Sequence, residues 1–155
     1  MIHDLAARVL KIYDELGRDS LDLHAMFEIT ESHSPEQQEE ILNAVAELVG
    51  VGLLRPGEGG DFYSRTEDGR IRVAGPRDVT LYTRDGCHLC DAAKLAMAPA
   101  IKEFGARLRE VDIDGDPVLR QRYNDDVPVI FVGSREVARH KVDAAAFRGE
   151  LQSAK

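Results

Sequence analysis

Two cysteines, Cys87 and Cys90, are the feature that most limits how this chain can fold. They lie between an apolar, β-branched run at residues 79–83, which predicts a strand, and a helical pattern over residues 88–104. Residues 84–86 form a predicted turn between the two. A helix N-terminus carries unpaired N–H groups and a partial positive charge that stabilise a thiolate. The spacing therefore indicates thiol chemistry, with Cys87 as the exposed, attacking cysteine and Cys90 one helical turn behind it.

The small number of cysteines favours chemistry over a structural bridge. Two cysteines placed at random would have this spacing roughly one time in eighty. A disulfide closing so short a loop adds little global stability. We expect a cytoplasmic protein, because the sequence shows no secretory signal and no apolar run near the ~20 residues that cross a bilayer. A structural disulfide is not expected in that reducing compartment.

The distribution of charge divides the chain into two parts. The net charge of the whole chain is −8. Residues 1–75 contain seven Lys/Arg and fifteen Asp/Glu, whereas the remaining residues contain thirteen of each. With Gly75-Pro76 as the boundary, we predict domains at 1–74 and 77–155. The acidic first domain should repel phosphate backbones, so nucleic acid is not an expected partner.

The first domain is predicted to contain three helices followed by a β-hairpin. Its signals are a helix ending at Gly17, a short helix capped by Asp19 or Ser20, a helix starting in a capping box at Ser34-Pro35-Gln37 and ending at Gly50, and strands at residues 53–55 and 62–65. Residues 4–72 weakly resemble a winged helix, with residues 66–70 continuing the wing region. The third helix opens on acidic residues, which is the wrong charge for entering a DNA groove. A role in packing, homodimerisation or protein docking is the better interpretation.

The second domain alternates strands and helices in the order β-α-β-α-β-β-α. After the first strand and helix come a strand at residues 108–113, a helix capped by Asp116, a hairpin over residues 128–138 and a final helix capped by Asp143. The long crossovers predict that the first three strands are parallel, and the hairpin makes the last pair antiparallel. This pattern indicates a mixed sheet with helices on both faces.

Three segments of the second domain resemble the glutaredoxin-like proteins of the thioredoxin fold, in particular a bacterial branch with a CxLC motif. They are the segment 79–93 around Cys87-His88-Leu89-Cys90, the acidic stretch 110–114, and Asp126-Val127-Pro128 with the strand after it. The resemblance covers residues 77–153. It implies an α/β thioredoxin-like domain preceded by the small α+β winged-helix-like one. It also implies a cis Val127–Pro128 bond beside the cysteines, with the backbone before Pro128 binding the thiol substrate.

The sequence departs from glutathione-dependent relatives at two positions. They usually have Thr where this chain has Asp126, and a Gly pair in the region that here reads 138–143. Arg84 stands where they often have a Lys that meets the glycyl carboxylate of glutathione. We therefore expect no tightly bound cofactor, and leave open whether glutathione or another low-molecular-weight thiol is the reductant. No metal site is expected, because zinc needs four ligands and the sequence has no second CxxC.

The resulting hypothesis is a thiol–disulfide oxidoreductase acting on protein or small-molecule disulfides. Cys87 attacks and Cys90 resolves the mixed disulfide. Arg84 and His88 are either contributors of positive potential and substrate contacts or ordinary surface groups, and Val127 with Pro128 forms the substrate platform. The alternatives are a redox-responsive regulator, in which the dithiol state controls binding by the first domain, and a non-catalytic interaction protein. No membrane partner is expected.

Overall fold

The computed structural model describes residues 2–154, which divide into two compact units, with the division between Val73 and Ala74. Each unit has a hydrophobic core of its own. The division lies next to the expected boundary at Gly75-Pro76. Among the described residues, no helix has both the length and the apolar character that crossing a bilayer requires.

The first unit begins with helices α1 (Asp4–Leu16), α2 (Leu23–Ile29) and α3 (Pro35–Gly50). α1 ends at Gly17, whose φ of 63° lies in the left-handed region that glycine tolerates best. α3 starts in the predicted capping box, in which Ser34 Oγ accepts the Gln37 N–H and Gln37 Oε1 accepts the Ser34 N–H. The predicted cap of α2 is wrong. Asp22 caps this helix, because residues 20–22 are a short strand rather than a helix start.

That strand, β1 (Ser20–Asp22), belongs to a three-stranded antiparallel sheet of order β1-β3-β2. Its other strands are β2 (Leu54–Pro56) and β3 (Phe62–Arg65). Of residues 66–70, expected to continue the wing region, Thr66 is a helix cap and the others lie in helix α4 (Glu67–Arg72), whose first turn is capped by the Thr66 hydroxyl. The unit is therefore a small α+β domain, and its winged-helix character stays a prediction.

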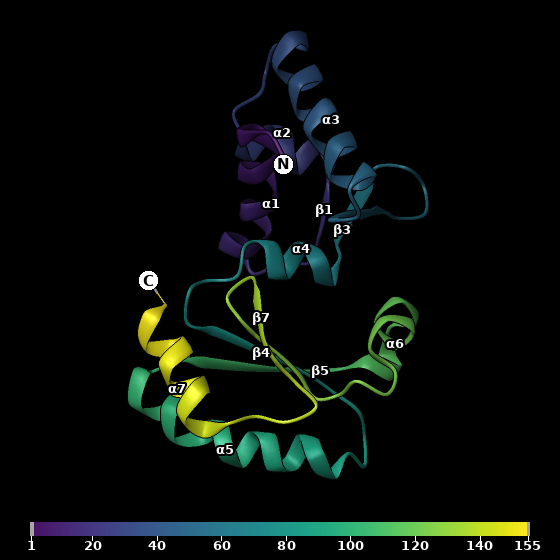
Figure 1. Cartoon of the computed structure of the whole chain (residues 1–155). Coiled ribbons are helices and arrows are strands. Elements are labelled where there is room, and N and C mark those ends of the chain that lie inside the picture. The colour runs from purple at the N-terminus through teal and green to yellow at the C-terminus, as the bar shows by residue number, and fades with distance from the viewer. Residues whose placement is uncertain (1, 155) are drawn as a thin grey trace. The chain divides into compact units, whose positions relative to one another are not determined.

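The second unit contains the predicted order of strands and helices around a four-stranded sheet (Figure 1). Its elements are β4 (Asp78–Thr83), α5 (His88–Phe104), β5 (Arg107–Asp112), a 3-10 turn η1 (Ile113–Gly115), α6 (Pro117–Tyr123), β6 (Val129–Val132), β7 (Arg135–Arg139) and α7 (Ala144–Ser153). The sheet order is β5-β4-β6-β7. β4 and β5 are parallel, as predicted, but β6 is antiparallel to β4. The expectation of three parallel strands is wrong because the chain enters β6 from the opposite end of the sheet.

The two faces of the second sheet are covered differently, by α5 and α7 on one side and by α6 on the other (Figure 1). Val79 and Leu81 of β4 join the core formed with α5 and α7. Tyr82 faces the other way, where its ring stacks on Tyr123 of α6 with centroids 5.0 Å apart. β4, buried between both layers, is therefore a firm support for the loop that carries the cysteines.

Candidate functional site

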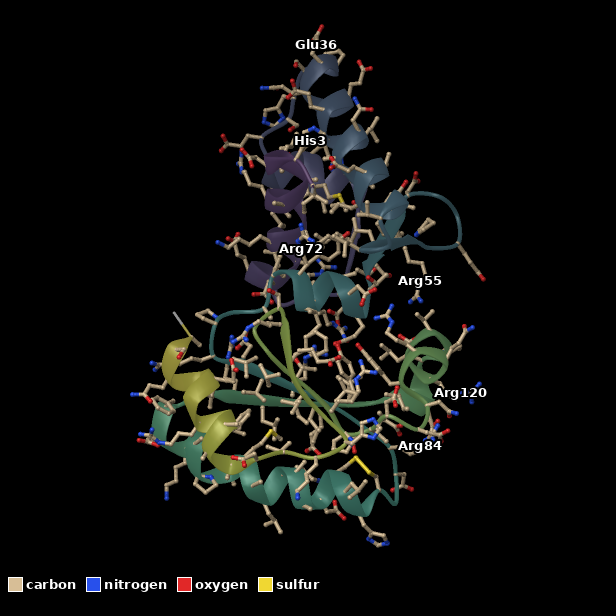
Figure 2. The ribbon with its side chains drawn as sticks, in the orientation of Figure 1. His3, Glu36, Arg55, Arg72, Arg84 and Arg120 are labelled. Carbon is tan, nitrogen blue, oxygen red and sulfur yellow. A yellow bond between two sulfur atoms is a disulfide. The ribbon has the colours of Figure 1, made fainter. Side chains whose placement is uncertain are left out.

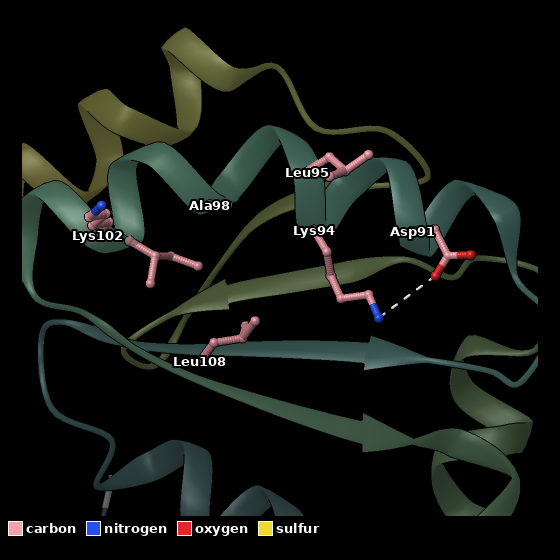
Figure 3. A pocket seen from close by; sticks show the side chains of 7 residues that line it. Asp91, Lys94, Leu95, Ala98, Lys102 and Leu108 are labelled. Carbon is pink, nitrogen blue, oxygen red and sulfur yellow. Dashed lines mark ion pairs between the residues drawn. The ribbon is translucent and has the colours of Figure 1, made fainter.

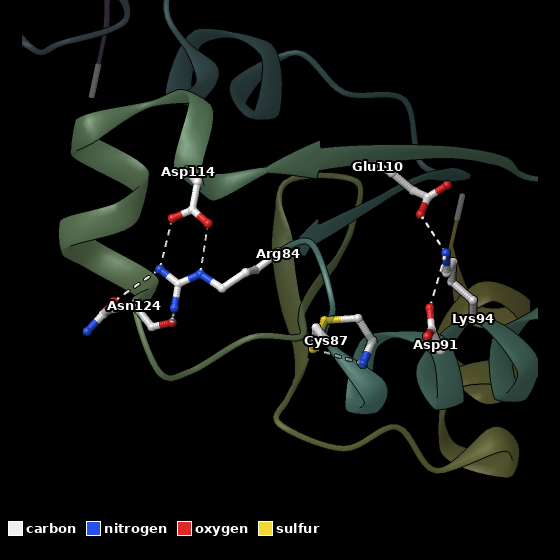
Figure 4. Close-up of a disulfide and its surroundings, with 8 residues drawn as sticks. Arg84, Cys87, Asp91, Lys94, Glu110, Asp114 and Asn124 are labelled. Atoms are coloured by element: carbon white, nitrogen blue, oxygen red, sulfur yellow. Dashed lines mark hydrogen bonds and ion pairs between the residues drawn. A yellow bond between two sulfur atoms is a disulfide. The ribbon is translucent and has the colours of Figure 1, made fainter.

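The site is built around a disulfide between Cys87 and Cys90 at the N-terminal end of α5 (Figure 2). Their Cα atoms are 5.3 Å apart. Cys87 is the N-cap residue of the helix, and its Sγ accepts the backbone N–H of Cys90 at 3.1 Å (Figure 4). A sulfur that caps a helix lies where the exposed N–H groups and the helix dipole favour negative charge. The position thus favours a Cys87 thiolate over the thiol.

The two cysteines differ in exposure. Cys90 is only 1% exposed because it faces the core from the first turn of α5. Cys87 is partly exposed, before the helix begins. Of the two, Cys87 is therefore the residue that a bulky molecule can reach.

The Val127–Pro128 peptide bond is cis, which confirms the sequence prediction. Tyr82 pairs with Val129, so the chain leaving β4 toward Cys87 and the chain entering β6 through Pro128 lie at the same end of neighbouring strands. The His140 N–H holds the Pro128 carbonyl at 2.8 Å. No other group within residues 2–154 forms a hydrogen bond with the backbone N–H or C=O of Val127. Its backbone N–H and C=O therefore have no partner among the described residues, and the residue as a whole is 8% exposed.

Arg84 lies three residues before Cys87, but its guanidinium is bound elsewhere in the protein (Figure 4). Its Nε and Nη2 donate to the two carboxylate oxygens of Asp114 at 3.0 and 2.9 Å. Nη1 and Nη2 also donate to the backbone and side-chain oxygens of Asn124 at 3.1 and 3.2 Å. The Asp114 hydrogen bond raises the pKa of Arg84, and in return Arg84 lowers the pKa of Asp114. Much of the positive potential that Arg84 could lend the site, one of the two roles considered for it, is therefore neutralised.

This Arg84 clamp, made of Arg84, Asp114 and Asn124, is what the sequence reasoning missed. It joins the loop before the cysteines to the turn η1 and to the end of α6, from which the chain continues to Pro128. The partners are 30 and 40 residues away from Arg84 in the chain, and no local pattern connects them.

The remaining charged residues of the region lie in separate groups. His88 is the first residue of α5 and is exposed. Asp91, one residue after Cys90, lies 3.7 Å from Lys94 Nζ, and that ammonium also pairs with Glu110 at 3.0 Å. Hydrogen bonding to Glu110 raises the pKa of Lys94. Asp91 is therefore partly compensated by Lys94.

Asp126, which occupies the position of a threonine in glutathione-dependent relatives, is the centre of another ion-pair group. Its carboxylate binds Arg139 at 3.0 Å and His140 at 3.1 Å. Arg139 also pairs with Glu136, and the Glu136 hydrogen bond raises the pKa of Arg139. The region that contains a Gly pair in those relatives thus carries charged side chains that form ion pairs with Asp126, in the loop before Pro128.

Comparison with known proteins gives consistent matches for this half of the chain. Residues 78–152 match the family described as Glutaredoxin-like domain (DUF836). The chain is 31% identical over 78 residues to the uncharacterized protein Rv0508 of Mycobacterium tuberculosis, covering 47% of this chain and 80% of that protein. It is 31% identical over 82 residues to the glutaredoxin-like protein YDR286C homolog of Dictyostelium discoideum, covering 49% of this chain and 76% of the relative.

Among solved structures, the chain is similar to target protein XcR50 from X. campestris, with 41% identity and a TM-score of 0.42 over 50% of this chain and 99% of that one. It is also similar to protein Ne2328 from Nitrosomonas europaea, with 32% identity and a TM-score of 0.43 over 48% of this chain and 89% of that one. The motifs, the topology of the second unit and the sequence relatives agree, and the chain belongs to the glutaredoxin-like family.

Proposed function

We propose that the protein catalyses thiol–disulfide exchange on protein or low-molecular-weight disulfides, with Cys87 as the nucleophile and Cys90 as the resolving residue. The observation that supports this most directly is the asymmetry of the pair. The partly exposed Cys87 caps α5 through its sulfur, and the buried Cys90 is directly bonded to it.

In the reduced protein, the Cys87 thiolate attacks one sulfur of the substrate disulfide. A mixed disulfide forms, and the other substrate sulfur leaves as a thiolate that takes up a proton. Cys90 then loses its proton and attacks the Cys87 sulfur, which releases the second substrate thiol. The substrate has gained two electrons and two protons, and the protein is left with the Cys87–Cys90 disulfide. A small thiol such as glutathione, acting as the reductant, would reverse these steps on the protein.

Substrate binding would use the free backbone groups of Val127. An extended peptide next to Pro128 can donate to the Val127 carbonyl and accept from its N–H, as a strand is added to a sheet edge. Arg84 is not available for a substrate carboxylate while it is bound to Asp114 and Asn124. Glutathione would therefore have to be held by groups other than Arg84, which stands where glutathione-dependent relatives often have a Lys.

The test compares two serine variants in the full chain. Cys87→Ser should abolish turnover of a small aromatic disulfide. Cys90→Ser should accumulate a mixed disulfide between Cys87 and the half of the aromatic disulfide that is not released, visible by mass spectrometry. The rate of Cys87 alkylation as a function of pH should give a thiol pKa below the free value of ~8.5. Turnover by Cys87→Ser, or an unshifted thiol pKa, would contradict the proposal.

A second candidate is a redox-responsive regulator, and it is favoured by the existence of the first unit. This unit has its own core and lies outside the family match. Glu36, Glu39 and Glu40 are exposed on α3, which favours a protein partner over DNA. Pull-down of partners with the cysteines reduced and oxidised would test it. Identical partners in both redox states would exclude the regulator and leave thiol–disulfide exchange as the one proposed function.

A further inference from the structure

A stripe along α5, beginning directly after Cys90, has no covering element among the described residues of the second unit. Asp91, Leu95, Ala98 and Lys102 are spaced at i, i+4, i+7 and i+11, so they lie along one side of the helix. Leu95 is 79% exposed. With Ile101 and with Leu108 of β5, the stripe lines a shallow apolar groove (Figure 3). An apolar surface of this kind, bordered by charged residues, is typical of an interaction site.

The order of residues along this stripe is self-complementary. Asp91 and Lys102 lie at opposite ends, with Leu95 and Ala98 between them (Figure 3). When two copies of the helix pack antiparallel about a twofold axis, each residue i faces residue 193 − i of the partner. Asp91 then faces Lys102 at both ends of the contact, and Leu95 faces the small Ala98 in the middle. Such a twofold contact uses the same surface on both copies.

We propose that the α5 stripe is the interface of a homodimer in which two α5 helices pack antiparallel. The pairing places a large apolar side chain against a small one, which lets the helices approach closely. The charges at both ends match only in the antiparallel arrangement. The Lys94 pairs with Glu110 and Asp91 stay within each copy and border the contact. This inference is independent of the proposed redox activity.

The oligomeric state of the full-length protein tests the proposal, measured by sedimentation equilibrium in a reducing buffer that excludes intermolecular disulfides. A reversible dimer is expected. Leu95→Glu should abolish it, because a charge would be buried against Ala98. Leu89→Glu is the matched control, since Leu89 is also exposed, at 57%, and is on the same helix but off the stripe. It should leave the dimer unchanged.

A charge exchange tests the antiparallel register. Asp91→Lys should raise the dissociation constant about tenfold or more, because two lysines then face each other at both ends. The double variant Asp91→Lys/Lys102→Asp should restore the wild-type constant to within about threefold. Four results would each overturn the proposal: a monomer at every concentration, a dimer that survives Leu95→Glu, a dimer lost equally in Leu89→Glu, or no recovery in the double variant.

Discussion

Gly69 of α4 is the position at which a single methyl group should do most damage to the first unit. A Cβ at this residue would lie 2.3 Å from the Leu53 carbonyl oxygen and 2.8 Å from Arg65 Cγ. The oxygen cannot easily move, because it accepts the Thr66 N–H at 3.1 Å. Nor can the Arg65 stem, because that side chain is 8% exposed and bound to Asp14 and Asp19.

The size of the effect of Gly69→Ala follows from two opposing contributions. Replacing Gly by Ala in a helix stabilises it by up to about 1 kcal/mol. Overpacking of a filled site costs about 1–3 kcal/mol and occasionally more. With a contact about 0.7 Å below the 3.0 Å that real Cβ atoms respect, the upper part of that range applies. We expect a net loss of about 2 kcal/mol, which for a unit of this size lowers Tm by roughly 8–16 °C.

Differential scanning calorimetry of the full chain measures this loss, and Gly149→Ala is the matched control. Gly149 lies in α7 of the second unit, where an added Cβ would meet nothing within 4 Å. This variant should gain about 0.5–1 kcal/mol. The two substitutions should therefore shift different transitions in opposite directions, and Cys87 alkylation should keep its rate in Gly69→Ala. An unshifted transition in Gly69→Ala would refute the packing argument, and a single transition moved by both variants would refute separate unfolding of the units.

Three further predictions concern charge and burial. Arg84→Gln and Asp114→Asn should change the Cys87 alkylation rate in the same direction, and the double variant should be no worse than either one; additive effects in this double-mutant cycle would contradict the Arg84 clamp. Asp19 accepts from Arg70, which lowers the Asp19 pKa, so the stabilisation is present above the unfolded pKa and is lost as pH falls through the folded one. In Asp19→Asn, the urea-denaturation midpoint should therefore depend less on pH below about pH 4 than it does in the wild type. An unchanged pH dependence would count against a stabilising role of this ion pair. Burial raises the pKa of Tyr13, whose hydroxyl donates to the Tyr63 carbonyl at 2.8 Å, so the folded state should lose stability as pH rises above about 10. Tyr13→Phe should reduce this loss in the same urea-denaturation assay. If the alkaline limb of the variant is identical to that of the wild type, the buried Tyr13 hydroxyl is not its cause.

Local signals in the sequence predicted local structure well. The capping box at Ser34 and the caps at Asp116 and Asp143 are present because each depends on residues within one helical turn. The start of α5 at His88, directly after Cys87, follows from the same kind of signal. The family resemblance predicted the cis bond before Pro128, which periodicity alone does not indicate.

Features that depend on distant parts of the chain could not be predicted. The strand Ser20–Asp22 exists because it pairs with β3, forty or more residues later, and three residues carry no strand signal of their own. The direction of β6 depends on which end of the sheet the chain enters, and the length of a connection does not specify this. The same holds for the Arg84 clamp. A cation three residues before Cys87 looks like a substrate ligand until the fold brings Asp114 beside it.

The position of β5 at the edge of the second sheet has a consequence for growth of that sheet from one molecule to the next. An edge strand exposes unpaired N–H and C=O groups to which a further strand can add. Residues directly opposite each other in an antiparallel pair of strands lie on the same face of the sheet. When β5 of one molecule pairs antiparallel with β5 of a second about a twofold axis, each even-numbered residue therefore lies opposite an even-numbered one, and each odd-numbered residue opposite an odd-numbered one. Every such register over Arg107–Asp112 sets two arginines or two carboxylates against each other. Like charges in opposite positions are unfavourable. This edge therefore resists self-templated strand addition, and copies of the chain are kept from assembling through it into extended sheets.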